Sequence, residues 1–278
     1  THLLTTTAHA YLLFFTNRGR VYRLRAHEIP MKDRTARGTA LVNLLSLDQD
    51  EFVQAIIDTR TYEDGAYLLF ATKKGVVKKT RMNDYDTRIS GGLIAINLRE
   101  DDELVAVVQT TGNDDIFLTS QDGMTIRFSE NGVRSMGRNA SGVRGMKLKN
   151  DSDRVVGCDV ARENAVMLYI SSQGYGKRTE QSAYNTQGRG GQGVRGVKVS
   201  PERGHVVAAF SVDESDEVLV FSSAGNIIRT NVSDISLQGR AASGVRVAKP
   251  GEDDQIVAVA RVLEREDKED KTSQDQGE

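Results

Sequence analysis

The sequence predicts an all-β protein, a propeller-like disc of about five four-stranded repeats. Two landmarks recur in step along the 278 residues. One is a glycine in a short turn between two apolar runs, and the other is an arginine four residues before a second glycine. Four predicted strands in a unit of about fifty residues are typical of a propeller blade. We find no long segment with the 3.6-residue apolar period of a helix.

Each repeat opens with a predicted β-hairpin. An apolar run leads into a turn that contains glycine, which is the short-range signature of a hairpin. The spacings between consecutive turn glycines are 56, 48, 51 and 51 residues, and a base always stands four residues after the glycine. The glycines are Gly19, Gly75, Gly123, Gly174 and Gly225, and the bases are Arg23, Lys79, Arg127, Arg178 and Arg229.

The second half of each repeat carries the arginine landmark. A loop of small residues leads into a short predicted strand, which is residues 42–44 in the first repeat. A polar turn and an apolar strand follow, and these complete the blade. The arginine–glycine pairs are Arg34/Gly38, Arg88/Gly92, Arg138/Gly142, Arg189/Gly193 and Arg240/Gly244.

The repeats are expected to form one domain over residues 1–263, because blades pack on their neighbours and build one continuous core. Residues 1–7 resemble the last strand of a further blade. Residues 264–278 hold seven acids and three bases, which predicts a disordered acidic tail. This tail could keep the protein soluble, or it could mimic DNA and compete for a basic surface. The predicted repeats are 8–60, 61–111, 112–162, 163–213 and 214–263.

The net charge of −2 is low for a protein that binds nucleic acid. Without the tail, 34 bases face 32 acids, so any such function must depend on how the charges are segregated. The recurring bases stand at equivalent places in the repeats, whereas acids gather in other turns, such as residues 48–51 and 100–103. We therefore predict that bases and acids lie at different edges of the disc.

The loop at residues 187–193 is the strongest candidate for a binding site. Its four glycines leave the backbone bare, so that phosphates can approach amide groups closely. The recurring arginines could instead be structural and bond to carbonyls. A nucleotide-binding P-loop is not expected, because no helix follows and no Lys–Ser/Thr pair ends the loop. The predicted DNA contacts are Gln187, Arg189, Gly190, Gly191, Gly193, Arg195, Lys177, Arg178, Arg240, Arg138, Arg88 and Arg34.

Other chemistries find little support in the sequence. The four histidines lack metal-ligand spacing, and no serine stands in a nucleophile motif. A propeller glycosidase needs acids at the central channel, but paired acids such as Asp101/Asp102 lie in predicted solvated turns. The single cysteine, Cys158, is expected to be buried and fits a reducing cytoplasm. Neither an eighteen-residue apolar stretch nor a signal peptide is visible.

Several stretches resemble the C-terminal domain of DNA gyrase A, the DNA-cleaving component of that topoisomerase. The loop at residues 187–193 is similar to the Gln-Arg-Arg-Gly-Gly-Lys-Gly box of that family, with Gly188 and Gln192 where the box has Arg and Lys. The likeness covers essentially residues 1–263. The other stretches that carry it are residues 14–22, 34–38, 43–45, 142–145 and 174–179.

The resemblance implies a β-pinwheel, a disc whose blades exchange a strand and whose basic edge wraps DNA without reading its sequence. Most members have one blade more than the five counted here, and their principal box lies in the first blade. The loop at 187–193 therefore resembles a second box, and we expect the principal one to lie outside this sequence.

The resemblance also implies partners and a location. The partners are double-stranded DNA, the rest of gyrase A, and gyrase B, in an A2B2 heterotetramer in the bacterial cytoplasm at the nucleoid. This domain would hold no cofactor or catalytic residue, since ATP and Mg²⁺ bind elsewhere in the ATP-dependent, supercoiling topoisomerase. Two alternatives stay open: a topoisomerase IV-type C-terminal domain that steers substrate topology, and a propeller scaffold that binds protein.

Overall fold

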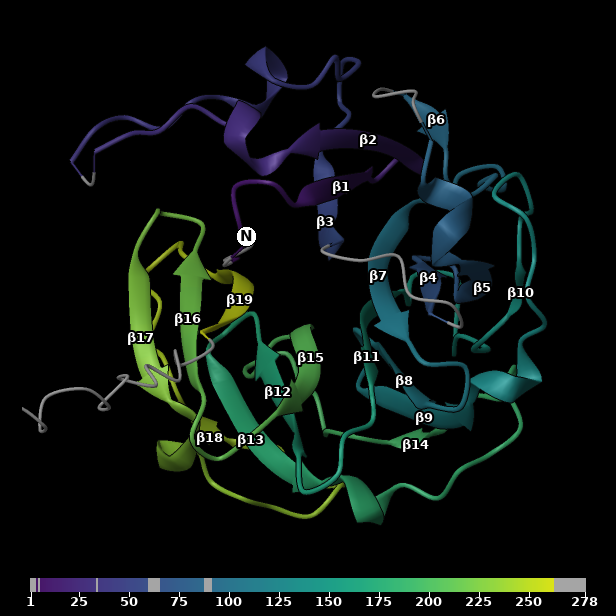
Figure 1. The fold of residues 1–278 in the computed structure, drawn as a ribbon. Helices are drawn as coiled ribbons and strands as arrows, with labels where there is room; N and C mark the ends of the chain where they lie inside the picture. Colours follow the sequence, from purple (N-terminus) through teal and green to yellow (C-terminus); the bar gives the residue numbers. More distant parts are fainter. Residues whose placement is uncertain (1–3, 5, 34, 60–65, 88–91, 263–278) are drawn as a thin grey trace, which may run out of the picture.

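The computed structural model describes residues 4, 6–33, 35–59, 66–87 and 92–262. These residues form nineteen β-strands and six 3-10 helices, with no α-helix among them. The strands form five antiparallel sheets arranged around a centre (Figure 1). The prediction of an all-β, propeller-like disc of five repeats is confirmed.

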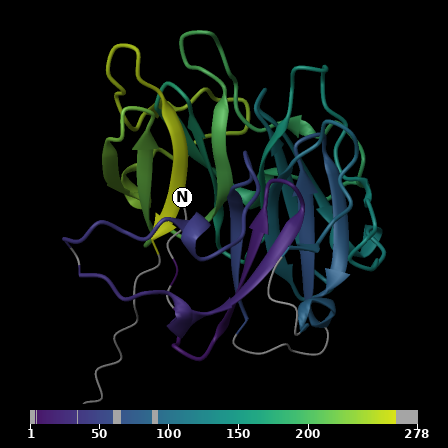
Figure 2. The same cartoon turned by 90° about the horizontal axis from the view of Figure 1, so that it is seen from above.

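The innermost strands surround the centre of the disc and share one cavity of about 990 Å³. In the edge-on view the strands run roughly along the axis of the ring (Figure 2). Each repeat contributes one inner strand: β3 (Val53–Thr59), β7 (Leu104–Thr110), β11 (Val155–Val160), β15 (Val206–Val212) and β19 (Ile256–Val262).

The predicted hairpins form the middle of each sheet. Their turn glycines have positive φ, as the tight turn requires. The first strands of the hairpins are β1 (Tyr11–Thr16), β4 (Tyr67–Thr72), β8 (Asp115–Ser120), β12 (Val166–Ser171) and β16 (Glu217–Ser222). The second strands are β2 (Arg20–Arg25), β5 (Val76–Arg81), β9 (Met124–Ser129), β13 (Tyr175–Glu180) and β17 (Ile227–Asn231).

The outermost strand of a sheet comes from the following repeat. The sheet orders β3-β1-β2-β6, β7-β4-β5-β10, β11-β8-β9-β14 and β15-β12-β13-β18 each end on such a strand. In these four sheets, backbone pairing of a two-residue strand therefore joins each blade to the next. This is the strand exchange of a pinwheel. The exchanged strands are β6 (Leu93–Ile94), β10 (Val143–Arg144), β14 (Val194–Arg195) and β18 (Val245–Arg246).

The first repeat departs from the prediction. The strand expected at residues 42–44 is wrong, because the 3-10 helix η2 (Leu41–Asn43) occupies this place. In the other repeats this strand exists only by pairing with the second hairpin strand of the preceding blade. Among the described residues this segment pairs with no second hairpin strand, and the sheet of the fifth repeat, β17-β16-β19, keeps an unpaired edge at β17.

Short 3-10 helices follow the second strand of every hairpin. They turn the chain out of the hairpin toward the loop that leads into the next strand. These helices are η1 (Ala26–Glu28), η3 (Met82–Tyr85), η4 (Glu130–Gly132), η5 (Gln181–Ala183) and η6 (Val232–Asp234).

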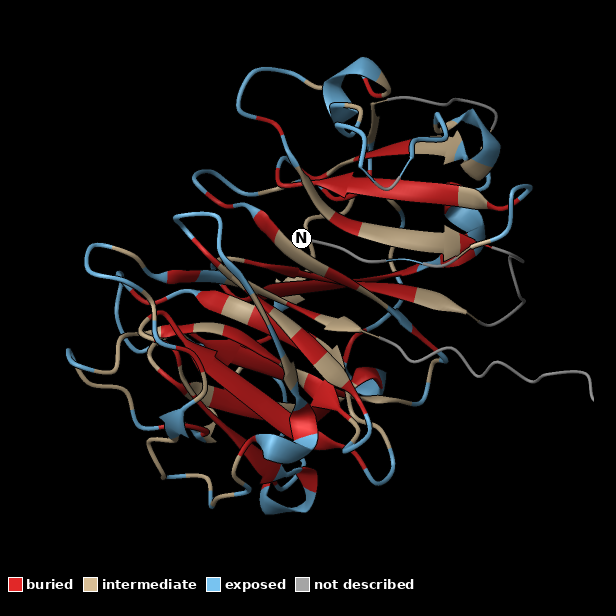
Figure 3. Ribbon diagram, turned by 90° about the vertical axis from the view of Figure 1, so that its left-hand side faces the viewer, coloured by how far each residue is buried: buried red, intermediate tan, exposed pale blue. Residues whose placement is uncertain are grey.

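The hydrophobic core lies between neighbouring blades rather than within each one. Phe15 of β1 packs edge-on against Phe70 of β4, with ring centroids 5.4 Å apart. Phe117 of β8 packs against Tyr184, just beyond η5, at 5.5 Å. Figure 3 shows the buried residues concentrated in the strands and the exposed ones in the loops. Cys158 is buried, as predicted.

Two acids in the polar turns are buried, and their carboxylates accept hydrogen bonds from the hairpin of the same blade. Asp102 accepts hydrogen bonds from the Thr72 hydroxyl at 2.6 Å and from the Lys74 amide at 2.9 Å. Glu51 accepts from the Thr16 hydroxyl at 2.6 Å in the same way. The interpretation of its turn as solvated is wrong for Asp102, because this carboxylate, like that of Glu51, fixes the hairpin turn of its own blade.

Two predictions concern the ends of the chain. The acidic tail at residues 264–278 lies outside the described residues. Of residues 1–7, the structure describes Leu4, Thr6 and Thr7, and none of these three is in a strand. In the described residues, no helix is long and apolar enough to cross a membrane.

Candidate nucleic-acid interface

The glycine that ends each arginine loop places the exchanged strand. Gly142, Gly193 and Gly244 have φ of +83°, +75° and +83°. At Gly193 a Cβ would clash with the Thr125 carbonyl of β9, and at Gly244 it would clash with the Gly176 carbonyl of β13. Only glycine combines this backbone conformation with so close an approach. The arginine four residues earlier is thereby held at the outer edge of the disc.

The predicted arginines lie at this edge. Arg138 and Arg240 are half-buried in their loops, whereas Arg189 and Arg195 are exposed. Arg34 and Arg88 lie outside the described residues.

Arg189 is partly committed to the fold. Its Nε donates to the Gly132 carbonyl at 2.6 Å, and a terminal nitrogen donates to the Arg144 carbonyl at 3.0 Å. These bonds fasten the loop at 187–193 to the preceding repeat. The side chain stays exposed, so this arginine both joins its loop to the preceding repeat and presents positive charge to solvent.

The backbone of the glycine-rich loop is less bare than predicted. The Gly190 amide donates to the Gly145 carbonyl at 2.7 Å, and the Gln187 amide donates to the Arg127 carbonyl at 2.8 Å. The prediction that the Gly190 amide receives a phosphate is therefore wrong. The Gln187 side chain is exposed, and Gly191 and Gly193 are half-buried.

Lys177 does not lie where DNA could reach it. It is fully buried in β13, and its ammonium donates to the carbonyls of Gly239 and Arg240 at 2.6 and 2.7 Å. Burial, and next the nearby Arg240 guanidinium, lower the pKa of Lys177 to about 8. The predicted phosphate contact is wrong, because blades stack on both faces of the strand and leave no exposed side.

Arg178 is also buried, and its predicted contact with DNA is wrong for the same reason. Its guanidinium donates to the carbonyls of Ile235 at 2.6 Å and Ser233 at 3.3 Å, at the 3-10 helix of the next blade. Arg127 similarly bonds the carbonyls of Gln181 and Tyr184. In four repeats the base that follows the hairpin glycine thus bonds the neighbouring blade, and in the fifth Arg229 bonds Glu217 of its own hairpin.

The exchanged strands and the residues just after them carry six bases, of which the sequence interpretation included only Arg195. Two residues after the loop glycine stands an exposed arginine, and three residues later an exposed lysine, in three successive repeats. The repeated Arg-x-x-Lys spacing was the available signal, visible once the repeats are aligned on their loop glycines. The first two repeats have Ala40/Asn43 and Ile94/Asn97 at these places. The three basic pairs are Arg144/Lys147, Arg195/Lys198 and Arg246/Lys249.

We call residues 137–149, 188–198 and 239–249 the basic edge. Backbone hydrogen bonds join its three segments. The Lys147 amide donates to the Gly191 carbonyl at 2.9 Å, and the Lys198 amide donates to the Ala242 carbonyl at 3.2 Å. Bases from successive repeats are therefore held at fixed positions relative to one another.

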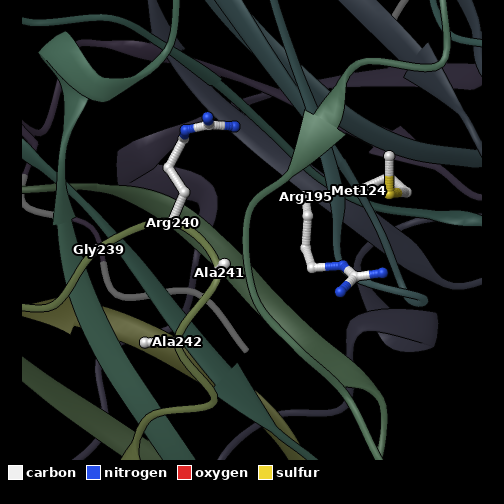
Figure 4. A pocket seen from close by; sticks show the side chains of 6 residues that line it. All are labelled: Met124, Arg195, Gly239, Arg240, Ala241 and Ala242. Carbon is white, nitrogen blue, oxygen red and sulfur yellow. The ribbon is translucent and has the colours of Figure 1, made fainter.

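A depression of about 650 Å³ opens in the basic edge between two repeats. Figure 4 shows the side chains of Arg195 and Arg240 on either side of Ala241. The described residues that line it are these three with Met124, Gly239 and Ala242, and none is an acid. The two guanidinium groups point in different directions (Figure 4), and each lies beside small residues that let a phosphate approach it.

Arg246 is ordered in advance by an aromatic ring. Its guanidinium lies 4.4 Å from the centre of the Tyr175 ring and donates to the Tyr175 hydroxyl at 2.5 Å. Arg203 lies 4.5 Å from the centre of the same ring and donates to the Gly244 carbonyl at 2.8 Å. Such packing reduces the side-chain entropy that binding would cost.

Comparison with known families assigns this architecture. The model of the DNA gyrase C-terminal domain, a β-propeller, matches residues 10–60, 66–111, 114–162, 168–213 and 216–262. The chain belongs to the DNA gyrase C-terminal domain family. DNA gyrase A of Mycolicibacterium smegmatis is 42% identical over 262 residues, which are 94% of this chain and 31% of that protein. The chain thus spans about a third of the relative's length.

Solved structures agree on the gyrase fold. The match to "Structure of DNA gyrase A C-terminal domain" has a TM-score of 0.81 and 29% identity, and it covers 93% of this chain and 84% of that one. The C-terminal domain of DNA topoisomerase IV gives a TM-score of 0.83 with 27% identity, over 92% of this chain and 80% of that one. The fold alone therefore does not separate the gyrase domain from its topoisomerase IV counterpart.

Proposed function

We propose that this chain binds double-stranded DNA without sequence preference and wraps it along the basic edge. The observation that supports this most is the exposed Arg-x-x-Lys pair, which begins at the end of three successive exchanged strands. Repeated bases on a curved surface match the repeated phosphates of a duplex, and no base readout is needed.

The number of contacts matters because wrapping bends the duplex. Smooth bending of a site of about 20–30 base pairs by 40–90° costs on the order of 1–6 kcal/mol. A single repeat offers two or three bases and would not offset this cost. Three repeats, linked by the bonds of Lys147 and Lys198, present their bases together.

In the whole enzyme, the wrapped DNA would be presented to a gate formed by the rest of gyrase A. With gyrase B present, and with ATP and Mg²⁺ bound elsewhere, strand passage would then introduce negative supercoils at the bacterial nucleoid. Within this scheme the domain bends the DNA and supplies the positive charge that binds it, and it takes no part in cutting DNA. The predicted contacts that remain are Gln187, Arg189, Gly191, Gly193, Arg195, Arg240 and Arg138, together with Arg34 and Arg88 from outside the described residues.

A topoisomerase IV-type role is the second candidate, since that structure matches equally well. Such a domain would steer the choice of DNA substrate without strong wrapping. The glycines at 190, 191 and 193 resemble the gyrase box and favour gyrase. A protein-binding scaffold is a weaker third possibility, because it gives no reason for bases at equivalent edge positions.

Binding of the 278-residue chain to two unrelated duplexes of about 30 base pairs tests the proposal, with salt varied from roughly 50 to 200 mM. We expect equal affinity for both duplexes and a steep fall of affinity with salt. A strong preference for one duplex would contradict phosphate-only recognition. No binding would favour the scaffold.

A further inference from the structure

Two fully buried lysines lie beneath two of the arginine loops. The Lys177 ammonium donates to the carbonyls of Gly239 and Arg240. The Lys78 ammonium, at the equivalent place in β5, donates to the Ala95 carbonyl at 2.6 Å, and also to the Arg138 carbonyl at 3.0 Å and the Gly137 carbonyl at 3.3 Å. In both blades the lysine thus holds the backbone of the loop arginine itself.

The fold does not require lysine at this position. The equivalent residues are Ile126 in β9 and Ile228 in β17, and Tyr22 in β2. Burying an ammonium is costly unless its donors are satisfied. Two lysines at a place that isoleucine can fill therefore point to a task other than packing.

The third blade shows how the loop is held without lysine. Here Ile126 lies under Gly191, and the Arg189 guanidinium bonds the carbonyls of Gly132 and Arg144. In contrast, the side chains of Arg138 and Arg240 make no hydrogen bond to any residue in the described part of the chain. Where a lysine holds the loop from below, the arginine side chain is thus free of hydrogen bonds to the described residues.

The rest of the Arg240 loop is fixed independently. The Thr179 hydroxyl donates to the Gln238 carbonyl at 2.9 Å, and the Gln238 side chain accepts from the Gly244 amide at 3.2 Å. These bonds hold the two ends of the loop. In the middle of the loop, the Gly239 carbonyl accepts from Lys177 and from the Ala242 amide at 3.1 Å, and the Arg240 carbonyl accepts from Lys177.

We propose that Lys78 and Lys177 are positioning residues, which hold the loops of Arg138 and Arg240 so that both guanidinium groups stay free for phosphate. The buried ammonium repels the guanidinium above it and so favours an outward conformation. This inference rests on the proposed function, because it assigns how the arginines are presented to DNA.

Crossed double-mutant cycles on DNA affinity test this pairing. The variants are Lys177→Met, Lys78→Met, Arg240→Ala and Arg138→Ala, singly and in all four lysine–arginine combinations. Lys177→Met should weaken binding about five-fold in the natural chain, a coupling of about 1 kcal/mol. It should have almost no effect when Arg240 is already alanine. Lys78→Met should depend on Arg138 in the same way, and the crossed pairs should be additive.

Amide hydrogen exchange on the free protein gives a readout without DNA. Lys177→Met should speed exchange at residues 239–242 and leave residues 138–142 unchanged, and Lys78→Met should do the reverse. A general increase in exchange at both loops would show a merely structural role and overturn the proposal.

The outcomes separate the two proposals. If Lys177→Met lowers DNA affinity by the same factor with Arg240 and with alanine at 240, the positioning role is overturned. The proposal that the chain binds DNA would still stand. Lack of binding by the natural chain would contradict both. If one lysine variant does not fold, the cycle at the other lysine decides, because each pair is predicted to couple on its own.

Discussion

The Lys198 amide donates a hydrogen bond to the Ala242 carbonyl across 3.2 Å, and so links the segment just after the exchanged strand of the fourth repeat to the arginine loop of the fifth. The Lys147 amide makes the same link one repeat earlier. Strand exchange therefore does more than hold blades together. It fixes the spacing of the bases that the edge presents.

Removing one exchanged-strand arginine should weaken DNA binding to the same degree for all sequences. Each of Arg144→Ala, Arg195→Ala and Arg246→Ala removes about one phosphate contact, which lowers the slope of log affinity against log salt by about 0.9. Titrations at several salt concentrations measure this slope. Arg154→Ala is the matched control, an exposed arginine beside inner strand β11, and it should leave the slope unchanged. An unchanged slope for all three edge variants would rule out the assignment.

The second repeat offers a gain-of-function test. Ile94 and Asn97 stand exposed where later repeats have arginine and lysine. Ile94→Arg with Asn97→Lys should extend the basic edge by one repeat and steepen the salt slope by up to about 1.8, for two added contacts. The same two bases at Asn150 and Ser152, in an exposed turn near an inner strand, serve as the control. If both pairs of substitutions strengthen binding equally, net charge rather than position explains the effect.

Gly193→Ala should destabilise the fold, whereas Gly188→Ala in the same loop should not. At Gly193 φ is +75° and a Cβ would meet the Thr125 carbonyl, but at Gly188 a Cβ meets nothing within 4 Å. We expect a loss of about 1–3 kcal/mol for Gly193→Ala and a change within about 0.5 kcal/mol for Gly188→Ala. Urea denaturation measures both values. Equal stabilities would mean that β14 is not held in the way described.

Lys78 should make stability depend on pH. Its burial, partly offset by Asp84, lowers the pKa of Lys78 from 10.5 to about 7. Between these values the unfolded chain binds more protons than the folded one, so the stability of the natural chain should rise with pH in this window. Relative to Lys78→Met, the rise should be at most about 1.4 kcal/mol per pH unit.

Urea denaturation of both proteins at pH 7, 8 and 9 checks this prediction. Ile126→Met changes the equivalent position without a titratable group, and it should show no such trend against the natural chain. A difference between the natural chain and Lys78→Met that stays constant with pH would mean that the lysine remains charged throughout.

The repeat, the hairpins and the strand content could all be predicted from the sequence, because turn glycines and apolar runs are local signals. Partners of the exchanged strands could not, since a two-residue strand such as Val194–Arg195 takes its partner from tertiary packing. The strand predicted at residues 42–44 failed for this reason. Lys177 and Arg178 were misplaced because a base in a strand normally marks a solvent face, and in stacked blades both faces are covered.

The candidate site was predicted in outline only. The loop arginines Arg138 and Arg240 and the exchanged-strand Arg195 lie at the outer edge, as the repeat spacing indicated. The interpretation overlooked Arg144 and Arg246, because it weighed one glycine-rich loop more than the pattern shared by three repeats. The hydrogen bonds of Arg189 depend on Gly132, 57 residues away in sequence, which no local pattern reveals.

The most direct test of the central claim is topological. The 278-residue chain is mixed with a relaxed closed-circular plasmid in the presence of a nicking-closing enzyme, the protein is removed, and the linking number is measured by gel electrophoresis. We predict a change in linking number that grows with protein concentration and is lost when Arg144, Arg195 and Arg246 are all alanine. The same assay is repeated on a chain extended at its N-terminus, because the 278 residues alone could wrap too little DNA to change the linking number. An unchanged linking number in both, with DNA binding retained, would contradict wrapping and favour the topoisomerase IV-type role.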